Sequence, residues 1–415
     1  MCLLFYRSSE EDFYSICKVL SFFSFIQIYT SKTYRKTTTN SRNDRLLNPN
    51  LPSNRFGQQP ILLFRYFFAT FAAVNFKGEK ILVTGASGFI GSFIVERLLE
   101  LGAEVWAGVR QSSSREYLQD SRIKFLELDF SDKGTLSDQL KSHGPWHHVI
   151  HAAGATKCKN AADFFTINTD GTRHFAEALI ETQTIKGRFI YFSSLSVFGP
   201  VRQEPTGNGK FHYAKITESD TPMPNSAYGQ SKLRAEAALE AIKDLDYVIL
   251  RPTGVYGPRE KDYFLMAKSI RQHIDFSVGF KPQEITFIFV RDLVDAACLA
   301  LSNGPSRRAY FLTDGEVYDS RAFSNLLQAE MGVRCVLHIK APLWLLHGVC
   351  KISGTLAKWR GKTTTLNMDK YHILRQRNWQ CDIQPAQELL GYVPKYKLEE
   401  GVKESVAWYK KAGWL

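Results

Sequence analysis

A tyrosine and a lysine stand four residues apart in the segment Tyr228-Gly229-Gln230-Ser231-Lys232. Side chains at this spacing share one face of a helix, so the phenol and the ammonium group can lie close together. A phenol has an ordinary pKa of about 10 and is a poor acid or base at neutral pH. A nearby ammonium group favours the phenolate and lowers that pKa, so the pair could perform general acid–base chemistry. The same spacing also occurs in surface pairs that have no function.

A serine follows an apolar run in the segment Phe192-Ser193-Ser194. The run 188–192 predicts a buried strand, and ligands of parallel sheets bind at the carboxyl ends of the strands. At that edge the Ser194 hydroxyl could donate a hydrogen bond to a carbonyl oxygen. A cap at the end of the strand is the alternative role for this serine.

A glycine-rich turn follows the predicted strand Lys80–Thr84 and opens a stretch with apolar residues at helical spacing. Gly85 allows a tight turn, Gly88 lets a pyrophosphate approach the backbone, and Gly91 lets the helix pack closely on the sheet. The amino end of the helix then faces the phosphates with its free N–H groups and its dipole. We therefore predict a dinucleotide site formed by Gly85, Ser87, Gly88, Phe89, Ile90 and Gly91.

An arginine stands at the end of the second predicted strand, Glu104–Val109. Sites specific for NAD usually carry an acidic residue there, about 20 residues after the glycines, to bind the ribose hydroxyls. A guanidinium group instead pairs with a phosphate, so Arg110 favours NADP(H) over NAD, unless it is a solvated loop residue. Asp129 and Phe130 follow the third predicted strand, and we expect them beside the adenine.

Apolar runs alternate with helical patterns from Lys80 to Leu250. This alternation implies right-handed crossovers and a parallel sheet that is covered on both faces. We predict an α/β fold, with a Rossmann doubly wound parallel sheet in residues 77–258. Residues 259–415 should mostly form a smaller C-terminal substrate-binding lobe, from which one strand, 286–290, returns to the sheet.

Residues 1–76 carry aromatic patches and a polar stretch without a persistent period. We expect them to lie outside the folded enzyme, either as a disordered extension or as the product of a misassigned start. Their apolar runs are too short to span a bilayer. The later apolar helix 343–358 is interrupted by lysines, which argues against stable membrane insertion.

The overall composition limits the partners. The net charge of +12 is not concentrated in one basic run, so we expect no nucleic acid partner. The seven cysteines form no Cys-x-x-Cys pair, which argues against a disulfide framework and a metal site and favours a reducing, cytoplasmic location. We expect a small-molecule substrate and leave a homodimer open.

Taken in order, these motifs resemble the extended short-chain dehydrogenase/reductase superfamily over about residues 77–415. The resemblance implies that Tyr228 is the catalytic acid or base and that Lys232 lowers its pKa and holds the nicotinamide ribose. It also implies that Ser194 binds the reacting oxygen and that Asn168 supports a water-linked proton path. It further assigns cofactor contacts to Tyr228, Lys232, Ala152, Ala153, Gly154, Pro252 and Val255.

Two substrate classes of this superfamily fit less well. Sugar dehydratases carry a second acid–base pair where this chain has Leu195 and Ser196, which cannot perform that chemistry. Nucleotide-sugar epimerases usually carry an arginine for the diphosphate where this chain has Ile285. Arg259 or Arg291 could take the place of that arginine, so an epimerase is weakened as an interpretation but not excluded.

The remaining resemblance is to reductases of apolar alcohols and ketones. Arg110 is similar to the corresponding residue of dihydroflavonol reductases, and the C-terminal stretches around 366–370 and 388–392 are similar to 3-beta-hydroxysteroid dehydrogenase-like proteins of the NAD-dependent epimerase/dehydratase family. We therefore expect hydride transfer between NADP(H) and a secondary alcohol or ketone of a steroid-like or flavonoid-like substrate. The alternatives are an epimerase with tightly bound NAD and a non-catalytic cofactor sensor. An apolar substrate would suit a predicted pocket formed by Phe198, Tyr263, Phe264 and Met266.

Overall fold

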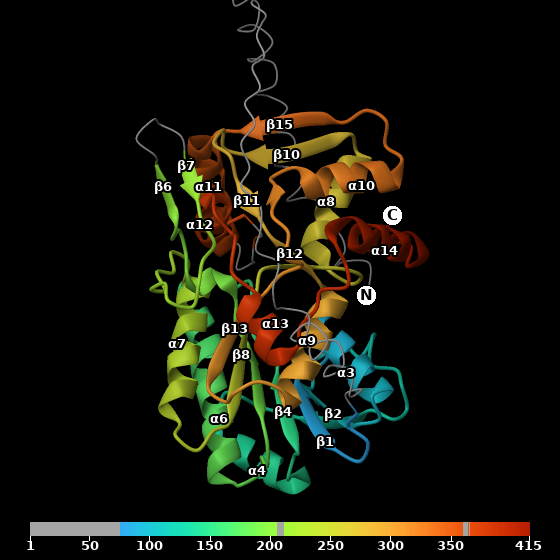
Figure 1. Ribbon diagram of the computed structural model, residues 1–415, viewed down its shortest axis with the longest axis vertical. Helices are drawn as coiled ribbons and strands as arrows, with labels where there is room; N and C mark the ends of the chain where they lie inside the picture. Colours follow the sequence, from blue (N-terminus) through green and yellow to red (C-terminus); the bar gives the residue numbers. More distant parts are fainter. Residues whose placement is uncertain (1–74, 206–210, 360–363, 365) are drawn as a thin grey trace, which may run out of the picture. The chain divides into compact units, whose positions relative to one another are not determined.

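The centre of the protein is a seven-stranded parallel sheet in the order β13-β8-β5-β4-β1-β2-β3 (Figure 1). The computed structural model describes residues 75–205, 211–359, 364 and 366–415. The prediction for residues 1–76 falls almost wholly outside this range. The strands are β1 (Lys80–Thr84), β2 (Glu104–Val109), β3 (Lys124–Glu127), β4 (His148–His151), β5 (Phe189–Phe192), β8 (Tyr247–Pro252) and β13 (Arg308–Leu312).

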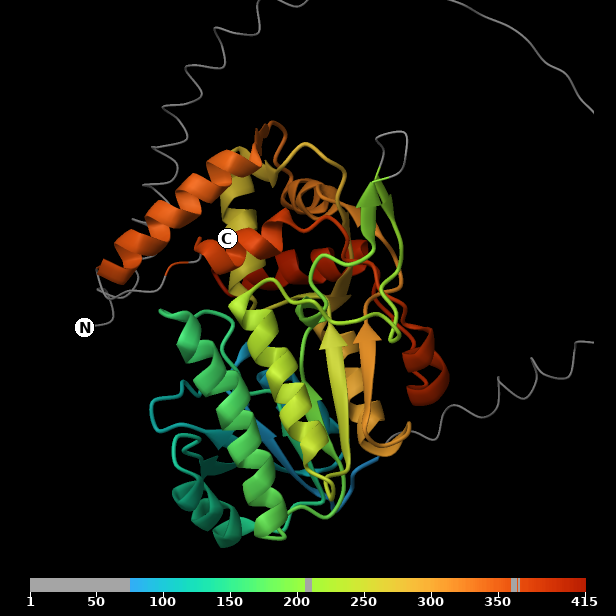
Figure 2. The ribbon, with the colours of Figure 1, turned by 90° about the vertical axis from the view of Figure 1, so that its left-hand side faces the viewer.

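Both faces of the sheet are covered by helices, because successive side chains of each strand point to opposite faces. Ile81 and Val83 of β1 belong to one apolar cluster with α3 (Phe89–Glu100) and α9 (Val290–Ser302). Leu82 between them belongs to a second cluster on the other face. That face is covered by α4 (Lys133–His143), α6 (Gly171–Glu181) and α7 (Ala227–Ala241), of which α6 and α7 lie in front of the sheet in Figure 2. The predicted α/β Rossmann-like fold is confirmed.

The strand that returns to the sheet is not the predicted one. The predicted run 286–290 contains β12 (Phe287–Phe289), which pairs with β9 (Gly254–Tyr256) in a separate two-stranded sheet. Helix α9 begins directly at Val290, so the chain first crosses the face of the sheet. The chain then continues into β13, which pairs with β8 in parallel register. The sequence shows both apolar runs but not which of them occupies the edge of the sheet.

The lobe lies at the carboxyl ends of the sheet strands, above the sheet in Figure 1. An aromatic-rich cluster that includes Tyr256, Phe287 and Phe323 forms its core. Its strands form small pairs, of β10 (Ile274–Val278) with β15 (Leu337–Ala341) and of β11 (Glu284–Ile285) with β14 (Tyr318–Asp319). Its helices are α8 (Lys261–Arg271), α10 (Ala322–Met331), α11 (Leu343–Trp359), α12 (Met368–Arg375) and α14 (Leu398–Lys411). Helix α13 (Gln384–Leu390) instead packs on β13 and α9 beside the central sheet.

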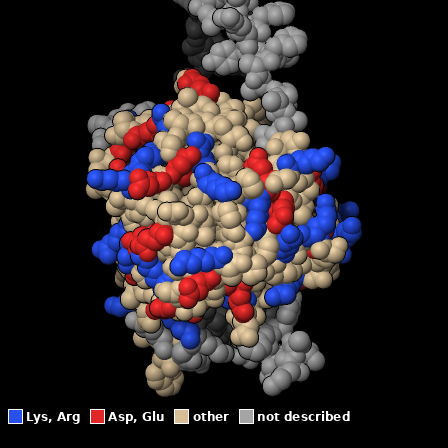
Figure 3. Space-filling view, turned by 90° about the horizontal axis from the view of Figure 1, so that it is seen from below, with Lys and Arg blue, Asp and Glu red and all other residues tan. Residues whose placement is uncertain are grey.

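The described residues belong to one compact unit, Thr70–Leu415, so the sheet and the lobe do not separate into two bodies. Basic and acidic side chains are interspersed on the face at the end of the sheet away from the lobe (Figure 3). Among the described helices, none combines the length and the apolar character needed to cross a membrane.

Candidate active site

Two groups of predicted cofactor residues meet where the strand order reverses, between β1 and β4. Residues 85–91 follow β1, and Ala152, Ala153 and Gly154 follow β4. Parallel pairing brings both segments to the same edge of the sheet, and the Ala152 N–H donates to Thr84 O at 3.2 Å. In open α/β sheets, ligands bind at this topological switch point.

The glycines of the turn are required by close backbone contacts. Gly85 has a φ of 70°, and a Cβ atom there would lie 2.6 Å from Ala153 N. At Gly91 a Cβ atom would lie 2.1 Å from Gly85 O, so a larger residue would push α3 away from the turn. Gly88 is the N-cap of α3 and offers no capping side chain, which leaves the first N–H groups of the helix for an anion. This arrangement fits a dinucleotide pyrophosphate.

A second observation also fits a bound group at this edge. Ser193, directly after β5, is buried, and its Oγ forms no hydrogen bond within the described part of the chain. A buried hydroxyl without a partner costs free energy, which a ligand that supplies the partner would recover.

The residues expected around the adenosine lie at the ends of β2 and β3. Arg110 is exposed, and its backbone N–H donates to Ser113 Oγ at 3.0 Å within a tight turn. The exposed Asp129 carboxylate accepts hydrogen bonds from Ser131, which lower the pKa of Asp129. The Phe130 ring is half-buried and packs edge-on against Phe175 of α6.

Ser194 lies directly after β5 and caps a short 3₁₀ turn, Leu195–Val197. Its Oγ accepts a hydrogen bond from the Ser196 N–H at 3.1 Å. The Ser194 hydroxyl also lowers the pKa of the nearby Tyr228 phenol. The structure therefore shows the capping role of this serine, and its role as a donor to a carbonyl oxygen stays a prediction.

Tyr228 lies in the first turn of α7, which packs against the turn that carries Ser194. Ser226 caps the helix, and its Oγ accepts from the Gly229 N–H at 3.0 Å. A Cβ atom on Gly229 would lie 2.4 Å from Ser196 O. The glycine after Tyr228 therefore lets the helix approach closely enough for the tyrosine and Ser194 to meet.

Lys232 lies one helical turn after Tyr228 and is only 5% exposed. Its Nζ donates to Phe192 O at 2.7 Å and lies 4.7 Å from the centre of the Tyr191 ring. Burial lowers the pKa of Lys232 to about 8, with Glu236 opposing the shift.

The pKa of Tyr228 is raised, which is opposite to the direction expected from the neighbouring lysine alone. Burial is the main cause, because a phenolate would lose its hydration. The Ser194 hydroxyl lowers the pKa and the Asp369 charge raises it. The spacing of Tyr228 and Lys232 indicated their shared helix but not the depth at which the phenol lies.

Asn168 is fully buried in a π-helical segment, Phe165–Asp170, between α5 (Ala161–Phe164) and α6. Its Nδ2 donates to Ser231 Oγ and to Ala155 O, both at 3.0 Å, and its Oδ1 accepts from the Ala155 N–H at 2.7 Å. Asn168 therefore ties the loop after β4 to the helix that carries Tyr228. π-Helical turns are often found at functional sites.

Pro252 and Val255 lie where β8 ends and β9 begins, on the far side of β5 from the glycine turn. Pro252 is the last residue of β8 and is buried. Val255 is half-buried and packs against the apolar cluster that includes α3 and α9. The structure thus brings residues from the ends of β1, β4, β5 and β8 and from α7 to one edge of the sheet.

Sequence reasoning missed Asp369, an aspartate of the lobe that lies at the amino end of α7. Its carboxylate accepts hydrogen bonds from the backbone N–H groups of Ala227 and Tyr228. Burial raises the pKa of Asp369. The segment 366–370 carries a resemblance to a family, but no local pattern connects Asp369 to Ala227, 142 residues earlier in the chain.

The four aromatic and apolar residues expected to line a pocket are mainly packing residues. Phe198 is buried against Phe311, with ring centres 5.1 Å apart. Phe264 is buried against Tyr409 and Trp414. Tyr263 and Met266 pack on the aromatic core of the lobe.

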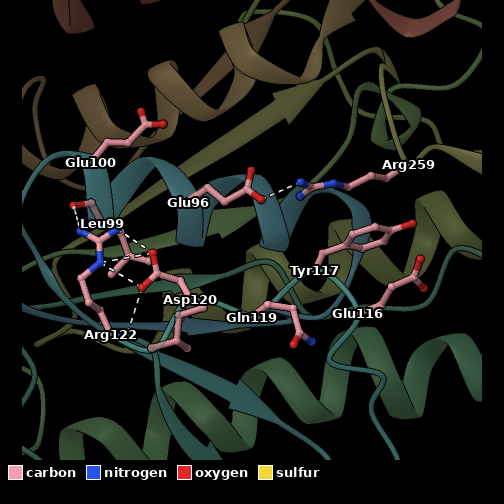
Figure 4. Close-up of a pocket in the computed structure, with 10 residues that line it drawn as sticks. Glu96, Leu99, Glu100, Glu116, Tyr117, Gln119, Asp120, Arg122 and Arg259 are labelled. Carbon is pink, nitrogen blue, oxygen red and sulfur yellow. Dashed lines mark hydrogen bonds and ion pairs between the residues drawn. The ribbon is translucent and has the colours of Figure 1, made fainter. Parts of the chain in front are cut away.

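Two arginines could take the place of the diphosphate-binding arginine that position 285 lacks. Both form ion pairs with glutamates of neighbouring helices. Arg259 pairs with Glu96 of α3 at 2.6 Å, and Arg291 pairs with Glu404 of α14 at 2.8 Å. Figure 4 shows the Arg259 guanidinium directed at Glu96 beside a surface hollow whose lining includes Glu100. Ile285 itself is half-buried against the apolar core of the lobe.

Comparison with known proteins agrees with this geometry. The chain is 26% identical to Sterol demethylase protein B of Methylococcus capsulatus over 347 residues, which cover 80% of this chain and 99% of that protein. It is 25% identical to the Ceramide reductase of Caulobacter vibrioides over 340 residues, which cover 81% and 96%. Among solved structures, UDP-glucose 4-epimerase of Thermotoga maritima with UDP-glucose matches with a TM-score of 0.63 and 24% identity, covering 80% of this chain and 99% of that one.

The fold and these relatives define an NAD-dependent enzyme of the extended short-chain dehydrogenase/reductase type. The chain belongs to the NAD-dependent epimerase/dehydratase family, whose sequence profile matches residues 81–312.

Proposed function

We propose that this protein is an oxidoreductase that interconverts a secondary alcohol and a ketone on an apolar, lipid-like substrate, with NADP(H) as its cofactor. The observation that carries the proposal is that α7, with Tyr228 and the buried Lys232, packs closely on the turn that carries Ser194, at the edge of the sheet that also holds the glycine turn. Net redox chemistry on a carbonyl needs an oxygen-binding donor, a proton donor and a cofactor site together.

Each of these residues has a part in the reaction. The hydroxyls of Ser194 and Tyr228 bind the substrate oxygen, and in reduction Tyr228 gives its proton to that oxygen. The buried Lys232 ammonium group stabilises the phenolate that remains. Asn168 holds the loop after β4 in place and thereby positions Lys232, because a Cβ atom on Gly154 would lie only 3.2 Å from Lys232 Nζ. A bound nicotinamide would supply the hydride in reduction and accept it in oxidation.

Two observations favour an apolar substrate. Ile285 cannot neutralise a diphosphate, and Arg259 and Arg291 are already engaged in ion pairs with Glu96 and Glu404. A buried diphosphate without cationic partners would be costly. The similarity to proteins named for a sterol and a ceramide is consistent with this substrate class.

Replacement of Tyr228 tests the redox assignment. Tyr228→Phe should lower kcat for ketone reduction by roughly 10²- to 10⁴-fold, because the proton donor is lost, while cofactor affinity measured by thermal shift stays within about twofold. Tyr310→Phe is the matched control, because it removes a buried hydroxyl that has no partner within the described residues, on β13. Full turnover by the Tyr228 variant would refute the assignment.

Replacement of Arg110 tests the cofactor. Arg110→Ser should raise KM for NADPH by about 10- to 100-fold and leave KM for NADH nearly unchanged, because only NADPH carries the 2′-phosphate. Arg115→Ser is the control, since that guanidinium stacks on the Phe125 ring 4.2 Å away. Equal effects on both cofactors would contradict NADP(H) specificity. Tightly co-purified NAD with no consumption of added NADPH across steroid, sphingoid and flavonoid ketones would instead support the epimerase.

A further inference from the structure

Helix α11 (Leu343–Trp359) exposes a set of large apolar side chains that are usually buried. Trp344 is 72% exposed, Ile352 70% and Trp359 84%, and Leu356 is also exposed. With Phe280 they make up five of the eleven large apolar side chains that are exposed among the described residues. Such a concentration marks an interaction surface.

The apolar side chains of α11 form two separate stripes. Leu346 and Cys350 are buried and face the rest of the lobe. On that side α11 packs on α12, with the His347 and Tyr371 rings 5.1 Å apart and Ser353 Oγ 2.9 Å from Thr364 Oγ1.

The second stripe consists of residues 345, 349, 352, 356 and 359, at alternating spacings of four and three, which places them along one side of a helix. Its outer members, Ile352, Leu356 and Trp359, are open to solvent. Among the described residues, the packing of the lobe therefore covers the first stripe and leaves Ile352, Leu356 and Trp359 of the second stripe exposed.

A further exposed aromatic side chain lies near the start of α11. Phe280 follows β10, and the preceding Gly279 N–H donates to Ala341 O at 2.8 Å, just before α11 begins. The exposed Phe280 ring is accompanied by Lys340, whose Nζ lies 5.7 Å from the centre of the ring.

The segment of chain that contains α11 carries only positive charges. Residues 332–368 contain no aspartate or glutamate, and their basic residues are Arg334, Lys340, Lys351, Lys358, Arg360 and Lys362. A second copy of this helix would bring like charges together without an acidic partner, which disfavours self-pairing. An anionic surface complements the charge and an acyl layer complements the apolar stripe, and a bilayer that contains anionic lipid offers both.

We propose that α11 and Phe280 dock the enzyme on the surface of an anionic lipid bilayer. The 17 residues of α11 span only about 26 Å, shorter than the hydrocarbon core of a bilayer, so the helix lies in the interface. Trp344 and Trp359 mark its two ends, and tryptophan rings favour the headgroup level. The docking stands independently of the proposed reaction, although it would bring a lipid-like substrate close to the enzyme.

Vesicle flotation with the full chain tests the docking and needs no substrate. We expect the wild type to float with vesicles of phosphatidylcholine and phosphatidylglycerol (about 7:3), to float much less with pure phosphatidylcholine, and to dissociate as salt rises. Ile352→Gln combined with Trp359→Ser should reduce bound protein by about tenfold or more. Val393→Gln is the control, because Val393 is 68% exposed outside this surface.

Circular dichroism and light scattering complete the test. The double variant should keep the wild-type spectrum and thermal midpoint, because both replaced side chains point to solvent. Unchanged flotation of a folded double variant would overturn the proposal, as would equal flotation with neutral vesicles. A wild-type dimer that the double variant converts to a monomer, without vesicle binding, would assign the stripe to a second copy instead.

Discussion

At the residue scale, the arrangement of Ser194, Tyr228 and Lys232 depends on burial as much as on spacing. Lys232 donates a hydrogen bond to Phe192 O, and Ser194 accepts one from the Ser196 N–H and lowers the pKa of the phenol. Burial raises the pKa of Tyr228 and lowers that of Lys232 to about 8. Near neutral pH the phenol is therefore protonated and the lysine mostly charged, which is the state suited to carbonyl reduction.

The pKa shifts of Tyr228 and Lys232 predict different pH profiles for alcohol oxidation and for ketone reduction. Alcohol oxidation needs the phenolate, whose fraction grows about tenfold per pH unit below its pKa, so kcat for oxidation should rise from pH 7 to about pH 8. Above pH 8 the rise should level off, because Lys232 loses the charge that stabilises the phenolate. Reduction needs the neutral phenol and the ammonium group, so its kcat should stay level to about pH 8 and then decline as Lys232 loses its proton. Initial rates at saturating cofactor would check both limbs. An oxidation maximum below pH 7 would contradict the assignment of Tyr228.

At the element scale, glycines set how closely two helices approach the edge of the sheet. Gly91 brings α3 onto the glycine turn, and Gly229 brings α7 onto the turn after β5. A local sequence pattern shows such glycines directly, so the dinucleotide turn and the helix with Tyr228 and Lys232 could be predicted. The same pattern cannot show which distant segment each helix meets.

Substitution of Gly229 tests this close approach. Gly229→Ala should force α7 away from Ser196 O and lower kcat for ketone reduction by about tenfold or more, because a displacement near 1 Å at the reacting groups is costly. Gly348→Ala in α11 is the matched control, since nothing lies within 4 Å of a Cβ atom there. Alanine is the better helix former, so the control should gain about 0.5–1 kcal/mol of unfolding free energy. Equal activity of both variants would argue against the close approach.

At the scale of the whole molecule, the lobe completes the site through Asp369. This carboxylate caps the helix that carries Tyr228, and its charge opposes formation of the phenolate. The contact joins α12 to α7 across a long stretch of chain, which explains why the sequence did not show it. The sequence also does not show whether residues 287–289 or residues 308–312 form the edge strand. Both runs are short and apolar, and only their tertiary pairing differs.

Two substitutions of Asp369 separate its cap from its charge. Asp369→Ala should destabilise the fold by about 0.5–2 kcal/mol, as loss of an N-cap does, and lower the thermal midpoint by a few degrees. Asp369→Asn keeps a hydrogen-bond acceptor but removes the charge, so the rise of alcohol oxidation with pH should move to lower pH. The two measurements are a thermal melt and the pH profile of kcat. An unshifted profile in the asparagine variant would mean that the charge does not reach Tyr228.

The position of β13 has a consequence for synthesis on the ribosome. Every other strand of the central sheet precedes residue 253, but the strand that covers the edge of β8 is residues 308–312. While the intervening residues are being translated, the nascent sheet presents β8 as an uncovered, apolar edge, the kind of edge that recruits other strands. The growing chain is thus exposed to association until residues 308–312 have been made and have paired with β8. Slow translation between residues 252 and 312 should therefore lower the yield of soluble enzyme.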